Sequence, residues 1–213
     1  MQIKWLGHAA FMITSDTGTR IITDPYADRD EFSYGEIQES ADIVTVSHEH
    51  SDHNNTAAVQ ENPEVVRGTA KVKGIEFKGV PTYHDNTKGQ QRGKNIIFCF
   101  EVDGVKTCHL GDLGHLLSDK ELAEIGKVDI LLIPVGGFYT IDAKVATQIC
   151  DALAPKVAIP MHFKNEKCAF PIAGVDEFLK GKENITRLDV SEVVFKQGAL
   201  PTVTQIVVLK PAL

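Results

Sequence analysis

The sequence has little of several features that would place a protein in a special class. Only 4 of its 213 residues are cysteines. These cysteines lack Cys-x-x-Cys spacing and are too few for a disulfide scaffold, so reduced thiols are expected. No segment approaches the roughly 20 consecutive apolar residues of a membrane span. We therefore expect neither a membrane-embedded protein nor a disulfide-stapled secreted domain.

Positive charge is also scarce. Lys and Arg number 22 against 29 Asp and Glu, which gives a formal net charge of −7. Sequence-independent binding of DNA or RNA needs a basic surface, so the composition argues against polymeric nucleic acid as a partner. A small anionic substrate is compatible with it. The first residues lack a basic segment followed by an apolar one, as a secretory signal would have, and a cytoplasmic location is therefore expected.

The remaining composition is that of a globular protein, with 43% hydrophobic and 24% charged residues. One domain typically takes roughly 100–200 residues. No Pro-, Gly- or Ser-rich linker divides the chain, so a single domain over residues 1–213 is expected. A homo-oligomer is compatible with these data.

Hydrophobic periodicity changes between the two halves of the chain. The first half predicts short strands separated by turns, and the second predicts helices alternating with buried strands. The expected strands are 3–6, 10–14, 20–23, 43–47, 65–68, 71–80, 95–102, 106–110, 130–134 and 157–160. The expected helices are 118–125, 142–153 and 175–180, with a shorter one at 56–59. The pattern alone predicts an α+β or α/β protein with two sheets covered by helices.

The densest group of metal-ligating side chains follows the predicted strand 43–47. Its pattern is His48-x-His50-x-Asp52-His53. In extended backbone His48 and His50 leave on the same side, and Asp52 and His53 follow as the chain turns. Imidazole nitrogens and carboxylate oxygens are ligands that zinc, manganese and iron accept. Two pairs of ligands on one loop therefore predict a site for two ions.

This pattern is the signature of the metallo-β-lactamase superfamily, which the chain resembles in the order of its further motifs. An isolated His84 follows one strand, Asp112 follows another after Leu110-Gly111, and His162 follows an apolar strand. The resemblance implies an α/β fold built as an αββα four-layer sandwich, with two mixed β-sheets flanked by helices.

The resemblance also implies a role for each ligand. One metal ion would be held by three histidines, the second by an aspartate and two histidines, and a further aspartate would bridge the two ions. These sets are His48, His50 and His84; Asp52, His53 and His162; and Asp112. Zinc is the first expectation for both divalent ions, with manganese, iron or nickel as alternatives, because the ligands are all nitrogen and oxygen.

Within the superfamily the chain is similar to the compact metal-dependent hydrolases related to ascorbate-6-phosphate lactonase. The segments that carry this similarity are Trp5-Leu-Gly7-His8, Asp24-Pro25 and Ile133-Pro134-Val-Gly136-Gly137. It implies a dinuclear metal-dependent hydrolase in which a metal-bridging hydroxide attacks a small ester, lactone or phosphodiester. Asp52 would orient that hydroxide or move its proton. Alternatives on the same scaffold are an iron-dependent redox enzyme and a metal-binding regulatory protein.

Substrate contacts are less defined by the sequence. The candidates are His8, His109 and Lys164. The polar segment 85–94 follows the His84 motif and carries two glycines, so we expect a mobile flap that offers Lys88, Arg92 or Lys94 to an anionic substrate. Phe138 and Tyr139 are candidate pocket walls.

Overall fold

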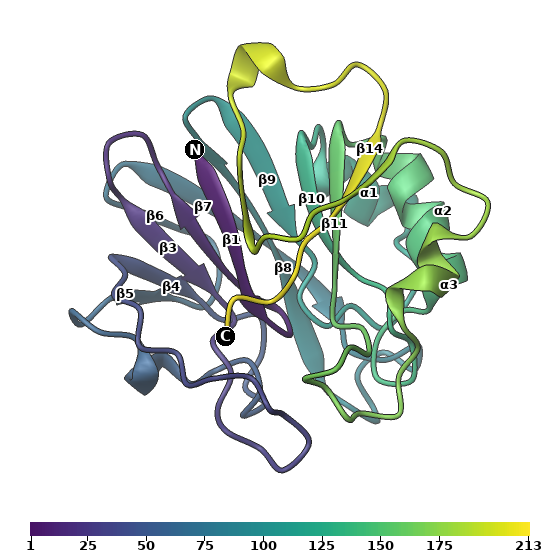
Figure 1. Ribbon diagram of the computed structural model, residues 1–213, viewed down its shortest axis with the longest axis horizontal. Helices are drawn as coiled ribbons and strands as arrows, with labels where there is room; N and C mark the ends of the chain where they lie inside the picture. Colours follow the sequence, from purple (N-terminus) through teal and green to yellow (C-terminus); the bar gives the residue numbers. More distant parts are fainter.

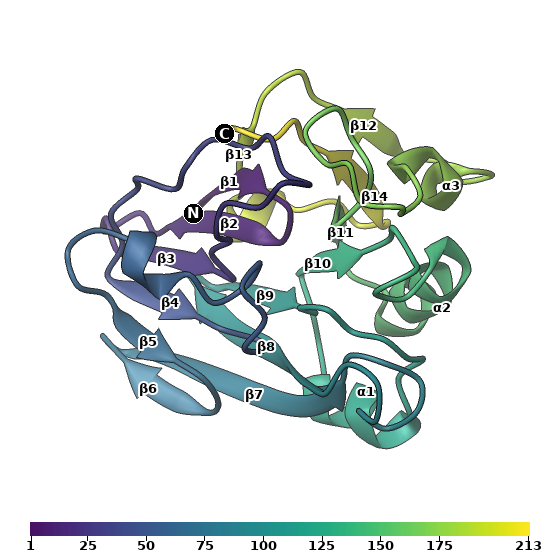
Figure 2. The same ribbon diagram turned by 90° about the horizontal axis from the view of Figure 1, so that it is seen from below.

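Short segments with alternating apolar residues build the first of two β-sheets in the computed structural model, which describes residues 1–213 (Figures 1 and 2). Six strands lie in the order β13-β1-β2-β3-β4-β5. Strands β1 to β3 are antiparallel, whereas β3, β4 and β5 run parallel, so the sheet is mixed. The strands are β1 (Gln2–Gly7), β2 (Ala10–Thr14), β3 (Arg20–Thr23), β4 (Ile43–Thr45), β5 (Glu64–Val66) and β13 (Glu192–Val194).

The second sheet has eight strands in the order β12-β14-β11-β10-β9-β8-β7-β6. Strands β6 to β9 form antiparallel hairpins, and β9, β10, β11, β14 and β12 are parallel. The strands are β6 (Ala70–Val72), β7 (Ile75–Tyr83), β8 (Lys94–Val102), β9 (Val105–His109), β10 (Ile130–Pro134), β11 (Val157–Met161), β12 (Ile185–Arg187) and β14 (Gln205–Val208).

The three α-helices lie on the outer side of the eight-stranded sheet (Figure 2). Helix α1 (Asp119–Ile125) begins at a capping box formed by Ser118 and Glu121, and α2 (Ala143–Leu153) is capped by the Asp142 side chain. A short helix, α3 (Val175–Leu179), packs beside α2. The expected fold class, two mixed sheets with flanking helices, is confirmed.

The outer face of the six-stranded sheet is covered differently. Aromatic side chains of the segment 24–42, among them Tyr26, Phe32 and Tyr34, pack on Leu6 and neighbouring apolar residues of the sheet. The only helical structure beside them is the single 3-10 turn η1 (Thr56–Ala58), where a short helix was expected. The helical layer is therefore well developed on one side only.

Two further differences from the sequence-based elements have local causes. The single strand expected at 71–80 is a hairpin of β6 and β7, because Lys73 and Gly74 adopt positive φ angles of 48° and 82° and close a two-residue turn. Strands β12, β13 and β14 were not predicted. Strand β13 completes the first sheet by pairing Val193 with Ile3, a contact between chain ends that no local pattern reveals.

The fold brings the motifs together because several strands end at the same edge. Strands β7, β9 and β11 point in one direction within the eight-stranded sheet, and β4 of the other sheet ends beside them, where Ile96 N donates a hydrogen bond to Ser47 O. Loops beyond the carboxyl ends of such strands are where ligand sites form. None of the helices is both long and apolar enough to cross a membrane.

Candidate metal centre

The loops after β4 and β7 supply the first group of candidate ligands. His48, His50 and His84 place one ring nitrogen each so that these atoms lie within 4.8 Å of one another. His48 Nε2 lies 3.1 Å from His50 Nδ1. His48 and His84 are buried, whereas His50 is exposed toward the cavity above. The three histidines expected to hold one ion are therefore together.

A second group of imidazoles lies beside the first. His8, His53 and His162 also have ring nitrogens within 4.8 Å of one another. Asp52 borders this group, with its Oδ2 3.9 Å from His53 Nε2 and 3.5 Å from His8 Nε2. The expected set of Asp52, His53 and His162 is thus assembled, and His8, a candidate substrate contact, lies within it.

Asp112 lies between the two groups. Its Oδ2 is 3.1 Å from His84 Nε2 and 4.0 Å from His48 Nε2 on one side. On the other side the same oxygen is 3.2 Å from His53 Nε2 and 3.4 Å from His162 Nε2. One carboxylate therefore faces both groups of ligands, as a bridging residue would.

The side chains of this centre fit divalent cations. Several of their buried nitrogen and oxygen atoms have no hydrogen-bond partner within the protein: both ring nitrogens of His8 and His162, His53 Nε2, His84 Nδ1 and Asp112 Oδ1. Leaving such atoms unpaired in the interior costs free energy, about 1–3 kcal/mol for each group. Neutral imidazoles and carboxylates are also the donors that such ions prefer. Bound cations would satisfy atoms that the protein itself leaves without partners.

Burial and neighbouring carboxylates together set the charge states of the histidines. Burial lowers the pKa of both His8 and His48 to about 3, so these rings are neutral, the form that binds metal. For Asp112 burial opposes ionisation, but the neighbouring His162 and His53 hold its pKa well below the usual value. For His53 burial opposes protonation, yet Asp112 and Asp24 raise its pKa well above the usual value. The ionised carboxylates therefore favour positive charge in this site, which a bound cation would supply.

Asp24 supports ligands of both groups, a role that was not predicted. Its Oδ2 accepts a hydrogen bond from His53 Nδ1 at 3.0 Å, and its carboxylate also accepts from the backbone N and the Oγ of Ser47. Because Ser47 Oγ donates its proton to Asp24, it accepts from His48 Nδ1 at 2.9 Å. Both histidines are then oriented with Nε2 free. The signal available in the sequence was the Asp-Pro pair closing the third strand.

The loop that carries Asp112 is held by Asn95. Asn95 Oδ1 accepts from Asp112 N at 3.0 Å, while its Nδ2 donates to Thr82 Oγ1 and to Leu110 O. Gly111 has a positive φ of 56°, and a Cβ there would lie 2.4 Å from Asn95 Oδ1. Glycine is therefore required for Asp112 to reach its position between the histidines.

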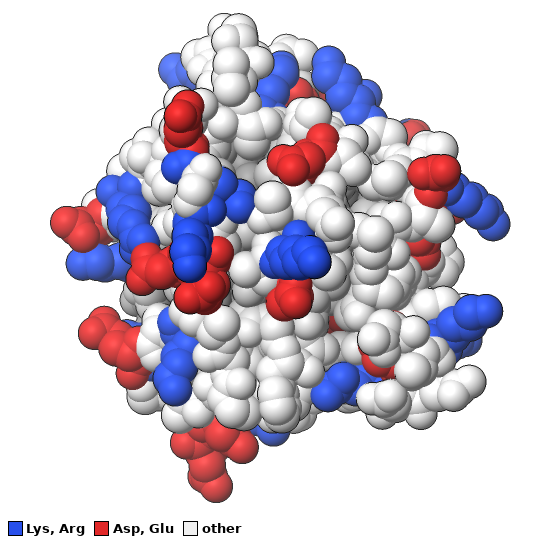
Figure 3. All heavy atoms as spheres, turned by 90° about the vertical axis from the view of Figure 1, so that its right-hand side faces the viewer, with Lys and Arg blue, Asp and Glu red and all other residues white.

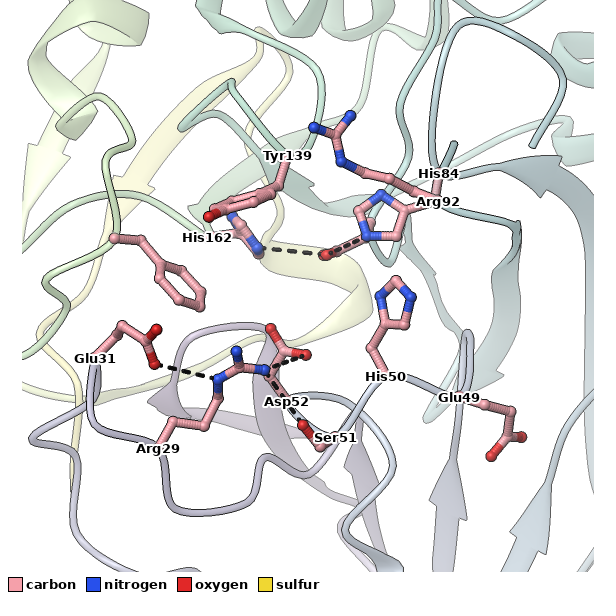
Figure 4. A pocket seen from close by; sticks show the side chains of 12 residues that line it. Arg29, Glu31, Glu49, His50, Ser51, Asp52, His84, Arg92, Tyr139 and His162 are labelled. Atoms are coloured by element: carbon pink, nitrogen blue, oxygen red, sulfur yellow. Dashed lines mark hydrogen bonds and ion pairs between the residues drawn. The ribbon is translucent and has the colours of Figure 1, made fainter. Parts of the chain in front are cut away.

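A cavity of about 440 Å³ opens over the centre (Figure 4). Its walls include Arg29, which lies 3.4 Å from Asp52 Oδ1 and 3.5 Å from Glu31 Oε2. On the opposite side the guanidinium of Arg92 lies over the Tyr139 ring, 5.6 Å from its centroid (Figure 4). Arg29 was not among the predicted site residues, and it comes from the segment that covers the six-stranded sheet.

The other predicted substrate contacts lie elsewhere. His109 is fully buried, donates from Nε2 to Ala9 O and accepts from Gly111 N at Nδ1, so the structure does not bring it to the cavity. Lys164 is exposed and does not line it. Of the two expected aromatic walls, Tyr139 lines the cavity and Phe138 is 64% exposed.

The segment 85–94, expected to be a mobile flap, has an internal frame. The Asp85 carboxylate accepts hydrogen bonds from the backbone N atoms of Thr87, Gly89, Gln91 and Arg92 and from the Thr87 hydroxyl. The loop is closed by Gly93 N donating to Gly89 O. The backbone of the loop is therefore wrapped around the Asp85 carboxylate, and Arg92 lines the cavity.

Comparison with known proteins identifies the family of the chain. The model of the β-lactamase superfamily domain matches residues 2–162. A UPF0173 metal-dependent hydrolase of Carboxydothermus hydrogenoformans is 30% identical, with 83% of this chain and 88% of that protein covered. Another from Archaeoglobus fulgidus is 29% identical over 93% of this chain and 97% of its own length.

Among solved structures, the chain is similar to a Thermotoga maritima protein assigned to the Zn-dependent hydrolases of the metallo-β-lactamase superfamily. The sequence identity is 39% and the TM-score 0.81, with 98% of this chain and 97% of that chain covered. The chain therefore belongs to the β-lactamase superfamily, among the UPF0173 metal-dependent hydrolases.

Proposed function

We propose that this metal-dependent hydrolase is dinuclear and cleaves a small ester, lactone or phosphodiester. The observation that carries the proposal is the position of Asp112 Oδ2, within 4.0 Å of histidines from both ligand groups. In this proposal one ion is held by His48, His50 and His84, the other by Asp52, His53 and His162, and Asp112 bridges them. Two such ions would lower the pKa of a shared water and polarise the bond under attack.

Asp52 is the proposed catalytic residue. Its carboxylate lines the cavity at the edge of the second ligand group. Burial opposes its ionisation, but the neighbouring His8 and His53 hold its pKa well below the usual value, so the carboxylate is ionised and can accept a hydrogen bond from a water molecule. Arg29 holds Oδ1 and His8 lies against Oδ2. These two contacts fix the direction in which Asp52 presents its oxygens to the attacking water.

The proposed substrate is a small anionic molecule. A cavity of about 440 Å³ is in the range of small-molecule sites. Arg29 and Arg92 approach it from opposite walls (Figure 4). On the face shown in Figure 3, basic and acidic side chains are interspersed, so that face offers no continuous basic surface to a polymeric nucleic acid.

Zinc is the proposed metal, with manganese, iron and nickel as alternatives. Every candidate ligand supplies nitrogen or oxygen, a set that all four metals accept. An iron-dependent redox enzyme on the same ligands is the competing function. Elemental analysis and an absorbance spectrum of the purified protein test the redox function, which requires iron: active protein without iron would exclude it, and protein with iron would have to be assayed for both reactions.

Hydrolysis is tested with bis(p-nitrophenyl) phosphate and a panel of lactones. We expect about two metal ions per chain, and a large loss of both metal and turnover in His50→Ala and Asp112→Ala. Asp151→Ala, on the exposed face of α2, is the matched control and retains both. Unchanged turnover in His50→Ala and Asp112→Ala would show that the dinuclear mechanism is wrong.

A further inference from the structure

A second cavity adjoins the metal centre. It has a volume of about 600 Å³ and lies between the loop after β4 and the start of β8. Glu49, His50 and Arg92 line both this cavity and the one over the metal ligands. The two spaces are therefore neighbours, separated by side chains that belong to each of them.

The charges around the second cavity are unbalanced. Its lining contains Arg67, Arg92 and Lys94 against a single acidic residue, Glu49. Arg67 Nε donates to Glu49 Oε1 at 2.9 Å, so these two charges neutralise each other. Neither Arg92 nor Lys94 forms an ion pair with the protein. Two uncompensated cations face one cavity in a chain whose formal net charge is −7.

Arg92 is held in place before any ligand arrives. Its backbone N donates to Asp85 Oδ2 at 2.8 Å, as part of the network that closes the loop 85–94. Its guanidinium rests on the Tyr139 ring (Figure 4). A cation fixed in advance loses less conformational entropy when it binds an anion. The boundary between the two cavities therefore carries a preorganised anion-binding group.

We propose that the second cavity binds a distal anionic group of the substrate, a carboxylate or a phosphate, through Arg92 and Lys94. The reacting bond would lie at the metal ligands in the first cavity, so the substrate is an ester or phosphodiester that carries a second anion. This inference rests on the proposed hydrolysis and adds a class of substrate to it. A guanidinium binds either oxyanion in a bidentate manner.

The test compares two esters that differ in one group. In p-nitrophenyl pentanoate the acyl chain ends in a methyl group, and in mono-p-nitrophenyl glutarate a carboxylate replaces that methyl. The ester of 4-phosphonobutanoate provides the phosphonate arm. With the metal-loaded full-length protein we expect kcat/KM to favour an anionic ester by roughly 10-fold or more. Whichever of the two anionic esters has the higher kcat/KM shows whether the cavity prefers a carboxylate or a phosphate group.

The variants assign that preference to the two cations. Arg92→Gln combined with Lys94→Gln should lower the ratio of anionic to neutral kcat/KM by about 10- to 100-fold, and Arg92→Lys should restore part of it. Lys71→Gln, on the exposed face of β6, is the control and leaves the ratio unchanged. An unchanged ratio in the double variant would overturn the assignment.

Anion binding is also measured without turnover, so that failure of the hydrolase proposal stays separate. In the same full-length protein, titration with glutarate or inorganic phosphate should shift the amide resonances of residues 92–96. The shifts should weaken in Lys94→Gln. If no ester is hydrolysed, the proposed activity is wrong. The titration would still show whether the second cavity binds an anion. Shifts confined to Asp52, His53, Asp112 and His162, none of which lines the second cavity, would place the anion on the metals and overturn the inference.

Discussion

Nδ1 of His53 lies 3.0 Å from Oδ2 of Asp24, and neither side chain is exposed to solvent. The hydrogen bond leaves the opposite ring nitrogen of His53 directed at Asp112, 3.2 Å away. Through Ser47 the same aspartate also reaches His48, which belongs to the other ligand group. One buried carboxylate outside the candidate ligand set thus orients a candidate ligand in each half of the centre.

Replacing this carboxylate should weaken metal binding. We expect Asp24→Asn to lower metal affinity by about 10- to 100-fold, because an amide cannot provide the charged acceptor that orients both rings. Competition with a chelator of known affinity measures the change independently of activity. Asp151→Asn serves as the control, because that residue is exposed on α2. Equal affinities in Asp24→Asn and the unmodified protein would contradict this role.

Metal removal should destabilise the whole fold. A ligand present at 100 to 1,000 times its dissociation constant stabilises the native state by about 2.7–4.1 kcal/mol. For a chain of this size that corresponds to a fall in melting temperature of roughly 5–15 °C on chelation. Calorimetry with and without chelator measures it. His50→Ala should respond less to the chelator, and a response equal to that of the unmodified protein would argue against its role as a ligand.

Two glycines allow the ligand loops to approach one another. A Cβ at Gly114 would lie 2.3 Å from Asp85 N, and one at Gly136 would lie 2.3 Å from His162 O. Gly114→Ala and Gly136→Ala should therefore lower the free energy of unfolding by about 1–3 kcal/mol and reduce metal content. Denaturant titration and elemental analysis measure both effects. Gly198→Ala, with open space around its Cβ, should change neither; comparable losses in it would refute the steric explanation.

A carboxylate far from the metal centre should contribute to acid sensitivity. Asp129 Oδ2 accepts from Lys106 N at 3.0 Å, and Lys156 Nζ lies 3.1 Å from Oδ1. Although burial opposes ionisation, these contacts hold the pKa of Asp129 below its usual value. The stabilisation is therefore present above the unfolded-state pKa, about 3.9, and is lost as the pH falls through the folded-state pKa.

Asp129→Asn isolates this contribution. The variant should lose about 1 kcal/mol or less at pH 7, and its free energy of unfolding should fall less steeply than that of the unmodified protein below about pH 4. Chemical denaturation at a series of pH values gives both curves. Parallel curves over this range would show that Asp129 does not carry the effect.

The sequence was most informative where function depends on local spacing. The residue types and spacing of His48-x-His50-x-Asp52-His53 select the candidate ligands, and the structure brings all of them to one centre, although this segment consists of bends and a turn and not of extended backbone. Spacing was less informative at 71–80, where an alternating pattern spans a hairpin whose turn depends on Lys73 and Gly74. Over a segment of about ten residues, a single strand and a tight hairpin can show the same alternation of side chains.

Histidines away from the motif show where local information ends. His8 and His109 are both buried; His8 follows β1 directly, and His109 is the last residue of β9. The backbone of Ala9 and Gly111 occupies both ring nitrogens of His109, whereas those of His8 have no hydrogen-bond partner and lie among the candidate ligands. Ala9 O, which pairs with His109, and the candidate ligands around His8 come from distant parts of the chain, so sequence position could not distinguish the two residues.

The sequence by itself determined the family, the candidate ligand set and the kind of chemistry, because these depend on residue type and spacing within short motifs. Only the tertiary structure decided that Asp24 orients the ligands, that Arg29 holds Asp52 and that Arg92 borders two cavities. Each of these relationships depends on packing between separate segments. Physical proximity across a folded sheet is set by the whole chain, and no local pattern encodes it.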